Sequence, residues 1–154
     1  MDLAAAKARI VEDIRKYGCH VIQVQGNGPH PSFAYSVGIG RTSDSPDVCV
    51  FGLPAPSAHR LLHHYNKDVR EGGRFEPGQV LQGYIKNADC VLRPVDPSHH
   101  EALFGFNVWL HDGPRFRMLQ LVYPTVEGIW PWSEMATDWL RQQQPILENV
   151  SGPH

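Results

Sequence analysis

The segment FAYSVGIG, residues 33–40, constrains the fold more than any other part of the chain. Large apolar side chains occupy every second position, and alanine, serine or glycine fills the positions between them. This alternation is typical of a β-strand, because successive side chains of a strand point to opposite faces. We therefore predict a strand with one large apolar face and one face made only of small residues.

The small face of this strand has two interpretations. Small side chains let a helix or another backbone pack closely, which is the ordinary structural reason for such a pattern. They also leave room for a flat ligand, and a pocket of this kind is typically apolar with a few well-placed polar groups. We predict that any cofactor or ligand pocket is formed by Ala34, Ser36, Gly38, Gln120 and Trp132. The glutamine would supply a donor and an acceptor, and the tryptophan a flat apolar wall.

The remaining periodic segments predict a mixture of helices and strands. Helices are expected from a cap at Asp2 to Gly18, from Ser57 to about residue 72, from His99, and from Ser133 to before Pro145. Further strands are expected at residues 19–25, 48–53, 79–86, 90–95 and 115–123. The strand at residues 48–53 is apolar on both faces, which is typical of a covered central strand.

Together these elements predict the α+β class. We expect a single compact domain over residues 1–146, with a mostly antiparallel, strongly twisted or barrel-like sheet and three to four packing helices. Residues 147–154 are expected to form a frayed tail. The predicted core consists of Tyr35, Val37, Val48, Val50, Leu61, Leu62, Tyr65, Leu119 and Leu121.

Composition excludes several functional classes. The net charge of -2 over 154 residues argues against a broad nucleic-acid footprint or a polybasic membrane patch. No apolar run approaches the ~20 residues that a membrane span needs. An odd, sparse set of cysteines (Cys19, Cys49 and Cys90) is typical of a reducing compartment, and the first residues lack the apolar core of a signal peptide. We therefore expect a cytoplasmic protein whose partner is another protein or a small molecule.

One pair of histidines has a spacing that suits a metal site. His59 and His63 lie four residues apart on an expected helix and so share a face. The chain lacks the H-E-x-x-H motif, because Arg60 and Leu61 follow the first histidine where that motif has glutamate and any residue. A solvent-exposed stripe is the competing interpretation. The Walker, G-x-G-x-x-G and G-x-S-x-G motifs are also absent from the sequence.

Four segments resemble the bacterial family known as domain of unknown function 4262. They are YGCHVIQV at residues 17–24, PSFAYSVGIG at residues 31–40, PDVCVFGLP at residues 46–54 and LQLVYPTVEGIWPW at residues 119–132. The chain departs from the family pattern at Asp47, Tyr123 and Thr125, where glutamate, tryptophan and aspartate are common. The resemblance implies a fold and a cytoplasmic setting, and it implies no reaction.

Three functional hypotheses follow. The first is a non-catalytic binding or regulatory module, for example in a bacterial defence or toxin-neutralising system, which suits the absence of standard catalytic motifs. The second is a small cofactor-binding domain of the split-barrel type that holds a flavin, by analogy of architecture. The third is a metal-dependent enzyme that uses His59 and His63 with a third ligand from elsewhere in the chain.

Overall fold

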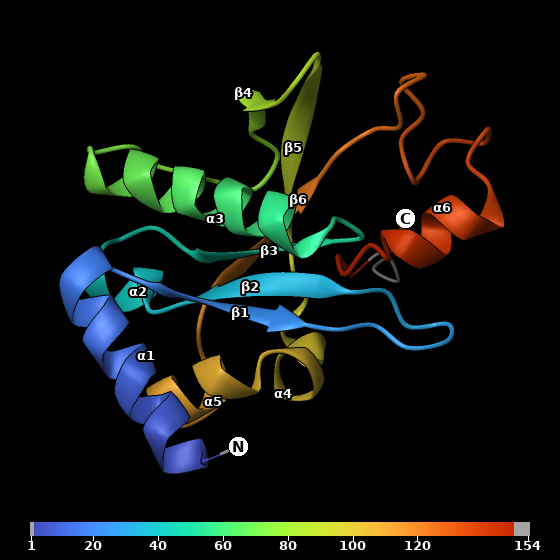
Figure 1. The fold of residues 1–154 in the computed structure, drawn as a ribbon. Coiled ribbons are helices and arrows are strands. Elements are labelled where there is room, and N and C mark those ends of the chain that lie inside the picture. The colour runs from blue at the N-terminus through green and yellow to red at the C-terminus, as the bar shows by residue number, and fades with distance from the viewer. Residues whose placement is uncertain (1, 150–154) are drawn as a thin grey trace.

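A six-stranded mixed sheet organises the computed structural model, which describes residues 2–149 (Figure 1). Its strands are β1 His20–Val24, β2 Phe33–Val37, β3 Asp47–Phe51, β4 Val80–Ile85, β5 Ala88–Pro94 and β6 Met118–Val122. They lie in the order β1-β2-β3-β6-β5-β4, and every neighbouring pair is antiparallel except the parallel pair of β3 and β6. The α+β class with a mostly antiparallel sheet is confirmed, and the sheet is open rather than closed into a barrel.

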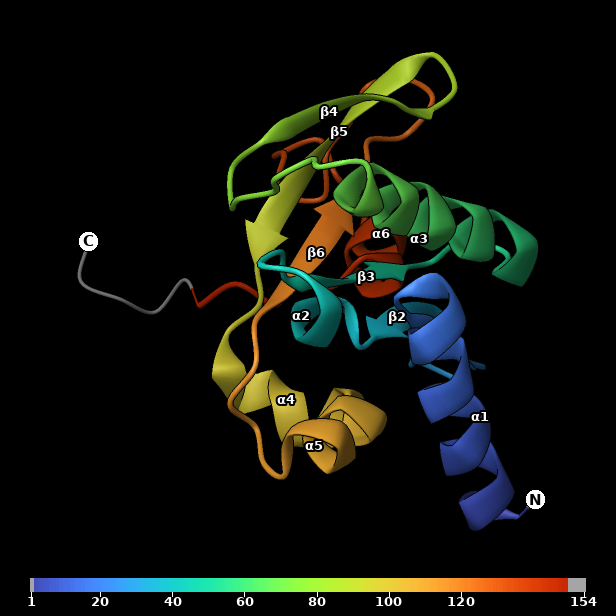
Figure 2. The ribbon, with the colours of Figure 1, turned by 90° about the vertical axis from the view of Figure 1, so that its left-hand side faces the viewer.

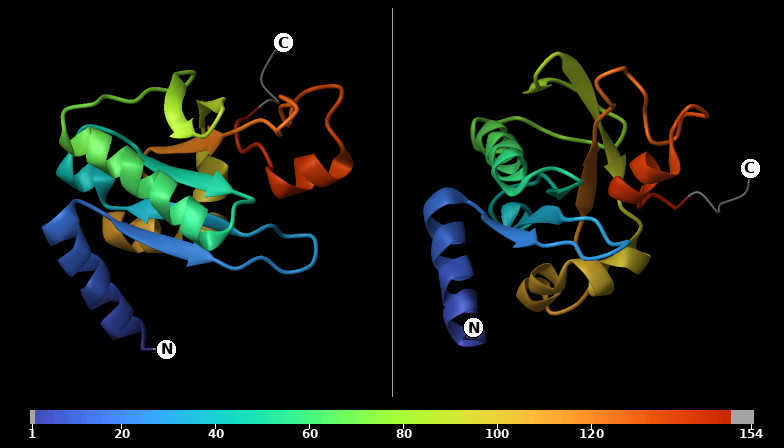
Figure 3. Two further views of the ribbon diagram at one scale, coloured as in Figure 1. Left: turned by 45° about the horizontal axis from the view of Figure 1, so that its top comes forward. Right: turned by 45° about the vertical axis from the view of Figure 1, so that its right-hand side comes forward.

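Helices cover both faces of this sheet. They are α1 Leu3–Tyr17, α2 Ile39–Thr42, α3 Ala55–Arg70, α4 His100–Leu103, α5 Gly105–His111 and α6 Asp138–Gln143. One face packs against α3, while α1, α4 and α5 lie against the other (Figures 1 and 2). Figure 3 shows α6 beside the sheet, apart from both of these layers. Residues 2–149 thus contain six helices instead of the expected three to four, and two of these, α2 and α4, span only four residues each.

The first helix begins and ends where its capping residues predict. The Asp2 side chain accepts a hydrogen bond from the backbone N–H of Ala4 at 3.0 Å. Gly18 ends the helix in the left-handed conformation with φ 91°, and its N–H donates to the carbonyl of Ile14. Ile10 is buried and Ile14 packs beside it against the sheet, so this apolar face attaches α1 to the domain.

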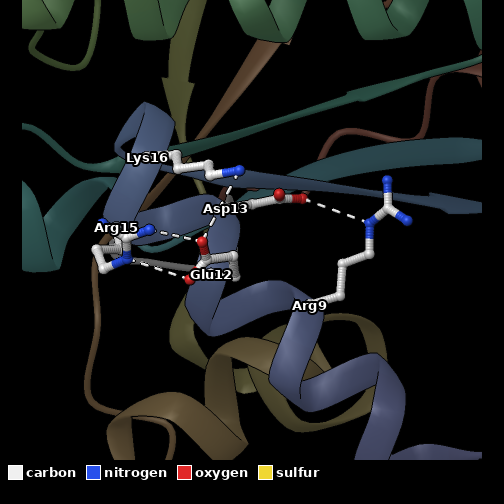
Figure 4. Close-up of polar contacts among 5 residues, drawn as sticks. All are labelled: Arg9, Glu12, Asp13, Arg15 and Lys16. Atoms are coloured by element: carbon white, nitrogen blue, oxygen red, sulfur yellow. Dashed lines mark hydrogen bonds and ion pairs between the residues drawn. The ribbon is translucent and has the colours of Figure 1, made fainter.

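Several ion pairs lie on the solvent-exposed side of α1 (Figure 4). Glu12 accepts two hydrogen bonds from the Arg15 guanidinium, at 2.6 and 3.1 Å, and lies 3.9 Å from Lys16. Arg9 lies 3.9 Å from Asp13 one turn away. Solvent screens exposed pairs of this kind, so the buried Ile10 and the partly buried Ile14 contribute more to the placement of α1 than these charges do.

The small face of β2 is covered by a helix. Ala34 is fully buried in one cluster with Ala58, Leu61 and Leu62 of α3, which is the ordinary structural interpretation of the pattern. The strand ends at Val37 rather than continuing to residue 40, and α2 follows it.

Gly38 explains why the strand stops early. It adopts φ 101°, a conformation that residues with side chains rarely take. A Cβ atom at this position would also lie 2.6 Å from the Ile14 side chain of α1. Gly38 therefore permits both the turn into α2 and the close approach of α1.

All nine predicted core residues are buried. The strand Asp47–Phe51 is buried along its whole length between β2 and β6, as its apolar faces predict. The sheet separates two apolar clusters. One contains α3 and the inner side of the β4–β5 hairpin, and the other contains α1, α4 and α5.

Several element boundaries differ from the predicted ones. Pro54 precedes α3, which begins at Ala55 with a proline in its first turn instead of a Ser57 cap. The last helix is capped by Thr137, whose hydroxyl accepts from the Leu140 N–H, because Ser133 lies in a preceding turn.

The predicted frayed tail is wrong at its first two residues. Leu147 is buried, and its carbonyl accepts a hydrogen bond from the Asp96 N–H at 2.9 Å. Glu148 pairs with Arg93. Residues 150–154 of the predicted tail lie outside the described residues. None of the helices in residues 2–149 combines the length and apolar character needed to cross a membrane.

Replacing Leu62 by alanine tests the packing of α3 on the sheet. Leu62 is fully buried in the cluster under α3, so Leu62→Ala should lower the free energy of unfolding by about 2–5 kcal/mol in urea titrations. Leu3→Ala is the matched control, because Leu3 is exposed and its truncation should cost under about 0.5 kcal/mol. Equal losses in the two variants would contradict the placement of α3.

Candidate ligand-binding site

Two neighbouring cavities lie beyond the carboxyl ends of the parallel strands β3 and β6. Leu53 follows β3, Tyr123 follows β6, and both residues line both cavities. Each cavity has a volume of about 300 Å³. In open sheets with parallel strands, ligands commonly bind outside the carboxyl ends of the strands. This part of the molecule is therefore the candidate functional site.

The first cavity, called the polar cavity below, carries positively charged side chains among apolar walls. It lies between α3 and the β4–β5 hairpin, which passes over that helix (Figure 2). Ser57, Arg60 and His64 reach it from successive turns of α3, and Lys86 reaches it from the hairpin turn. The ion pairs among residues 2–149 include neither Arg60 nor Lys86. Both positive charges are thus available to an anionic ligand.

An aromatic stack forms one wall of this cavity. The rings of His64 and Tyr84 are parallel, with centroids 4.0 Å apart. The Tyr84 hydroxyl donates a hydrogen bond of 2.5 Å to Asp68, and burial together with this carboxylate raises the pKa of the phenol. Tyr84 therefore stays protonated near neutral pH, and the hydrogen bond fixes the orientation of its ring.

The second cavity is mainly apolar. Pro124, Val126, Trp139 and Leu140 contribute its apolar walls, from the loop after β6 and from α6. The buried Gln144 side chain holds α6 against the sheet, because it accepts from the Tyr123 N–H and donates to the Tyr123 carbonyl.

Gly52 is needed where the two cavities meet. It adopts φ 80°, and a Cβ atom there would lie 2.9 Å from the Gln143 carbonyl oxygen and 3.0 Å from the Tyr123 hydroxyl. That hydroxyl donates to the Phe51 carbonyl at 2.7 Å, and burial raises the pKa of Tyr123 to about 12. The wall between the cavities is therefore closely packed and uncharged.

None of the three cysteines lines either cavity. All three cysteines are buried in the core, and burial raises the pKa of Cys19 and of Cys90 to about 12. Burial raises the pKa of Cys49 as well. Because the thiolate is the nucleophilic form, these residues are inert at neutral pH.

The pocket predicted from the sequence is not formed. Ala34 and Ser36 lie buried on the α3 side of the sheet, whereas Gln120 points to the opposite side. The Gln120 side-chain amide makes both of its hydrogen bonds with the backbone. It donates to the Pro145 carbonyl at 2.7 Å and accepts from the Leu147 N–H at 3.0 Å. Ala34 and Ser36 therefore pack inside the protein, and the glutamine anchors the segment after α6.

Trp132 is also separate from that strand. It is 50% exposed, stacks on Trp130 with centroids 5.2 Å apart, and lies beneath the Arg93 guanidinium. The flavin hypothesis relied on the small face of β2, which α3 occupies, so this strand gives it no support. Flavin binding stays a prediction, and the visible absorbance of the purified protein tests it.

The two histidines proposed as metal ligands do lie side by side. The ring centroids of His59 and His63 are 4.2 Å apart on α3, and burial and the neighbouring His59 lower the pKa of His63. However, residues 2–149 contain no group of three or more histidine, cysteine, aspartate or glutamate side chains placed to hold a metal ion. The third ligand that the metal hypothesis requires is not found among them.

Comparison with known proteins assigns the chain to a family. The sequence model described as Domain of unknown function (DUF4262) matches residues 13–137. The chain belongs to this family. The matched region includes every strand of the sheet, all of α3 and most of the lining of both cavities. No curated protein and no solved structure matches the chain.

Asp47 of this DUF4262 chain is a key polar residue that sequence reasoning missed. It is fully buried at the start of β3, where its Oδ1 accepts from the Ser36 hydroxyl at 2.7 Å and from the Ile39 N–H at 3.0 Å. The backbone amides of Gly38 and Gly40 also lie close enough to favour its charge. Burial outweighs these contacts and raises the pKa of Asp47 to about 6. The sequence did contain a signal for this residue, because Asp47 is the only charged residue of an otherwise apolar strand and stands at its first position.

The pH dependence of stability tests the state of Asp47. A raised pKa in the folded state stabilises the protein fully below the unfolded pKa near 3.8, and this contribution is lost as pH rises through about 6. The free energy of unfolding of the wild type, relative to Asp47→Asn, should therefore fall by about 3 kcal/mol between pH 3.5 and pH 7. Urea titrations across this range measure the difference. Parallel profiles for the two proteins would contradict it.

Proposed function

We propose that this DUF4262 chain is a non-catalytic binding module whose ligand is a small amphipathic anion. The anionic group lies near Arg60 and Lys86 in the polar cavity, and the apolar body lies against Val126 and Trp139 in the second cavity. The observation that carries the proposal is the adjacency of two unpaired positive charges and an apolar cavity across the shared walls of Leu53 and Tyr123.

The charge balance of the lining supports an anion over other ligands. Arg60 and Lys86 bring two positive charges to the lining of the polar cavity. The Asp68 carboxylate does not line the cavity and is already engaged by two wall residues, 2.5 Å from the Tyr84 hydroxyl and 3.5 Å from His64 Nε2. A cation would meet repulsion there, and a neutral apolar molecule would leave the two charges without a partner. An anion with an apolar body gains from both cavities.

We further propose a regulatory role in the bacterial cytoplasm. The three buried free cysteines suit a reducing compartment. In such a role, ligand binding would cover Val126 and Trp139, which are exposed in this structure, and so change the surface presented to a partner. An interaction protein of a defence or toxin-neutralising system is one setting for this change.

Octanoate is a suitable probe, because it joins one carboxylate to an apolar chain. Isothermal titration calorimetry should show binding of octanoate to the wild type. The double variant Arg60→Gln/Lys86→Gln should weaken it roughly tenfold, since two exposed charge pairs together contribute about 1–2 kcal/mol. Trp139→Ala should also weaken binding roughly tenfold, because apolar contact area is lost.

Matched controls separate this site from nonspecific binding. Lys67→Gln removes an exposed charge from α3 outside the cavities, and Met135→Ala removes an exposed apolar side chain near α6. Both should bind octanoate like the wild type. Binding of octan-1-ol or acetate as tight as that of octanoate would overturn the proposal, and so would unchanged affinity in the two site variants.

A further inference from the structure

A third cavity lies at the opposite ends of the same two strands. It has a volume of about 270 Å³ and is formed where β3 and β6 begin, between α2 and the segment that follows α5. Gly40, Asp47, His111, Arg115 and Arg117 line it, with Phe116 as an apolar wall. None of these residues lines the two cavities at the carboxyl ends of the strands.

A buried carboxylate oxygen in this cavity has no partner. Asp47 is 1% exposed, and its Oδ1 accepts from Ser36 and Ile39. The backbone amides of Gly38 and Gly40 lie near the carboxylate, but Oδ2 makes no hydrogen bond of normal geometry with the described residues. Oδ2 lies on the side of Gly40, because a Cβ atom at that glycine would be 3.9 Å from it. Leaving such an oxygen unpaired costs about 1–3 kcal/mol, which a ligand with a donor group would recover.

An imidazole nitrogen in the same lining is also unpaired. The Nε2 atom of His111 is buried and makes no hydrogen bond with the described residues. The ring stacks on Phe116 with centroids 5.4 Å apart. Burial, and to a smaller extent the charge of Arg41, lowers the pKa of His111, so its ring is neutral near pH 7. The cavity therefore holds one uncharged unpaired nitrogen in addition to the carboxylate oxygen.

Two positive charges complete the lining. Arg115 and Arg117 are exposed, and neither takes part in an ion pair with a carboxylate of the described residues. The Arg117 guanidinium donates to the backbone carbonyl of Asp44, which holds it near the start of β3. The cavity thus combines a buried acceptor with exposed cations at its rim.

We propose that this cavity binds a small zwitterion of the amino-acid class, with its ammonium group on Asp47 Oδ2 and its carboxylate on Arg115 and Arg117. A simple anion would place its charge beside the buried carboxylate, and a simple cation would be repelled by the arginines. A metal ion would find one carboxylate oxygen and one imidazole nitrogen, fewer than the three such side chains that a metal site needs among the described residues, and would meet the same repulsion. A zwitterion satisfies both charges, and charge-assisted hydrogen bonds at each end fix its orientation.

A series of ω-amino acids tests this site and measures its span. Glycine, β-alanine, 4-aminobutyrate and 5-aminovalerate separate the two charges by a growing number of methylene groups. Acetate, butyrate, methylammonium and butylammonium are controls that carry one charge each. Binding is followed by backbone and histidine side-chain shifts in NMR titrations. One member of the series should bind about tenfold or more tightly than each one-charge control, with shifts at Gly40 and His111.

Two variants locate the binding. Asp47→Asn keeps the shape of the side chain, and Arg115→Gln changes an exposed residue, so the second remains informative if the first fails to fold. Each should weaken the best zwitterion about tenfold. Arg60→Gln, in the other site, should leave this binding unchanged and so separates it from the octanoate site. The proposal is overturned if no member of the series binds at about 10 mM, if a one-charge control binds equally well, or if folded Arg115→Gln binds like the wild type.

Discussion

The hydrogen bonds that the Asp47 carboxylate accepts from Ser36 and Ile39 tie three elements together inside the protein. They join the end of β2 to the first turn of α2 and to the start of β3, and the Ser36 hydroxyl accepts in turn from the Val48 N–H. Because Asp47 pairs in register with Met118, the same residue sets where the parallel strands β3 and β6 begin. The positions of all three cavities depend on that alignment, since each lies at one end of this strand pair.

Local patterns were sufficient to predict the class of the fold and its core. The first helix was predictable because Asp2 and Gly18 act within a few residues of the helix ends. The central strand was predictable because a strand covered on both faces is apolar at every position. The turn at Gly38 was missed because glycine fits two roles equally well. It can continue the small face of a strand, and it can adopt a positive φ, here 101°, in a turn. Periodicity cannot distinguish these two uses.

The candidate site was less predictable, because its residues share no local pattern. Ser36 was proposed because its small side chain leaves room for a ligand, and Gln120 because its amide offers a donor and an acceptor. Each has a distant partner within the chain instead: Asp47 for the serine, and the backbone of residues 145 and 147 for the glutamine. Arg60 and Lys86 look like ordinary surface cations in the sequence. They meet only because the twisted sheet carries the β4–β5 hairpin over α3.

The two ends of the β3–β6 pair differ chiefly in one buried charge. At the carboxyl end, Arg60 and Lys86 face a wall whose polar groups are protonated phenols and an imidazole, so only an anion balances the lining. At the amino end, the Asp47 carboxylate lies behind Arg115 and Arg117. An anion that approaches the two arginines is therefore repelled by this carboxylate. Because the Asp47 oxygen is buried, that repulsion is screened far less than the attraction at the rim. The same strand pair therefore presents two sites of different selectivity.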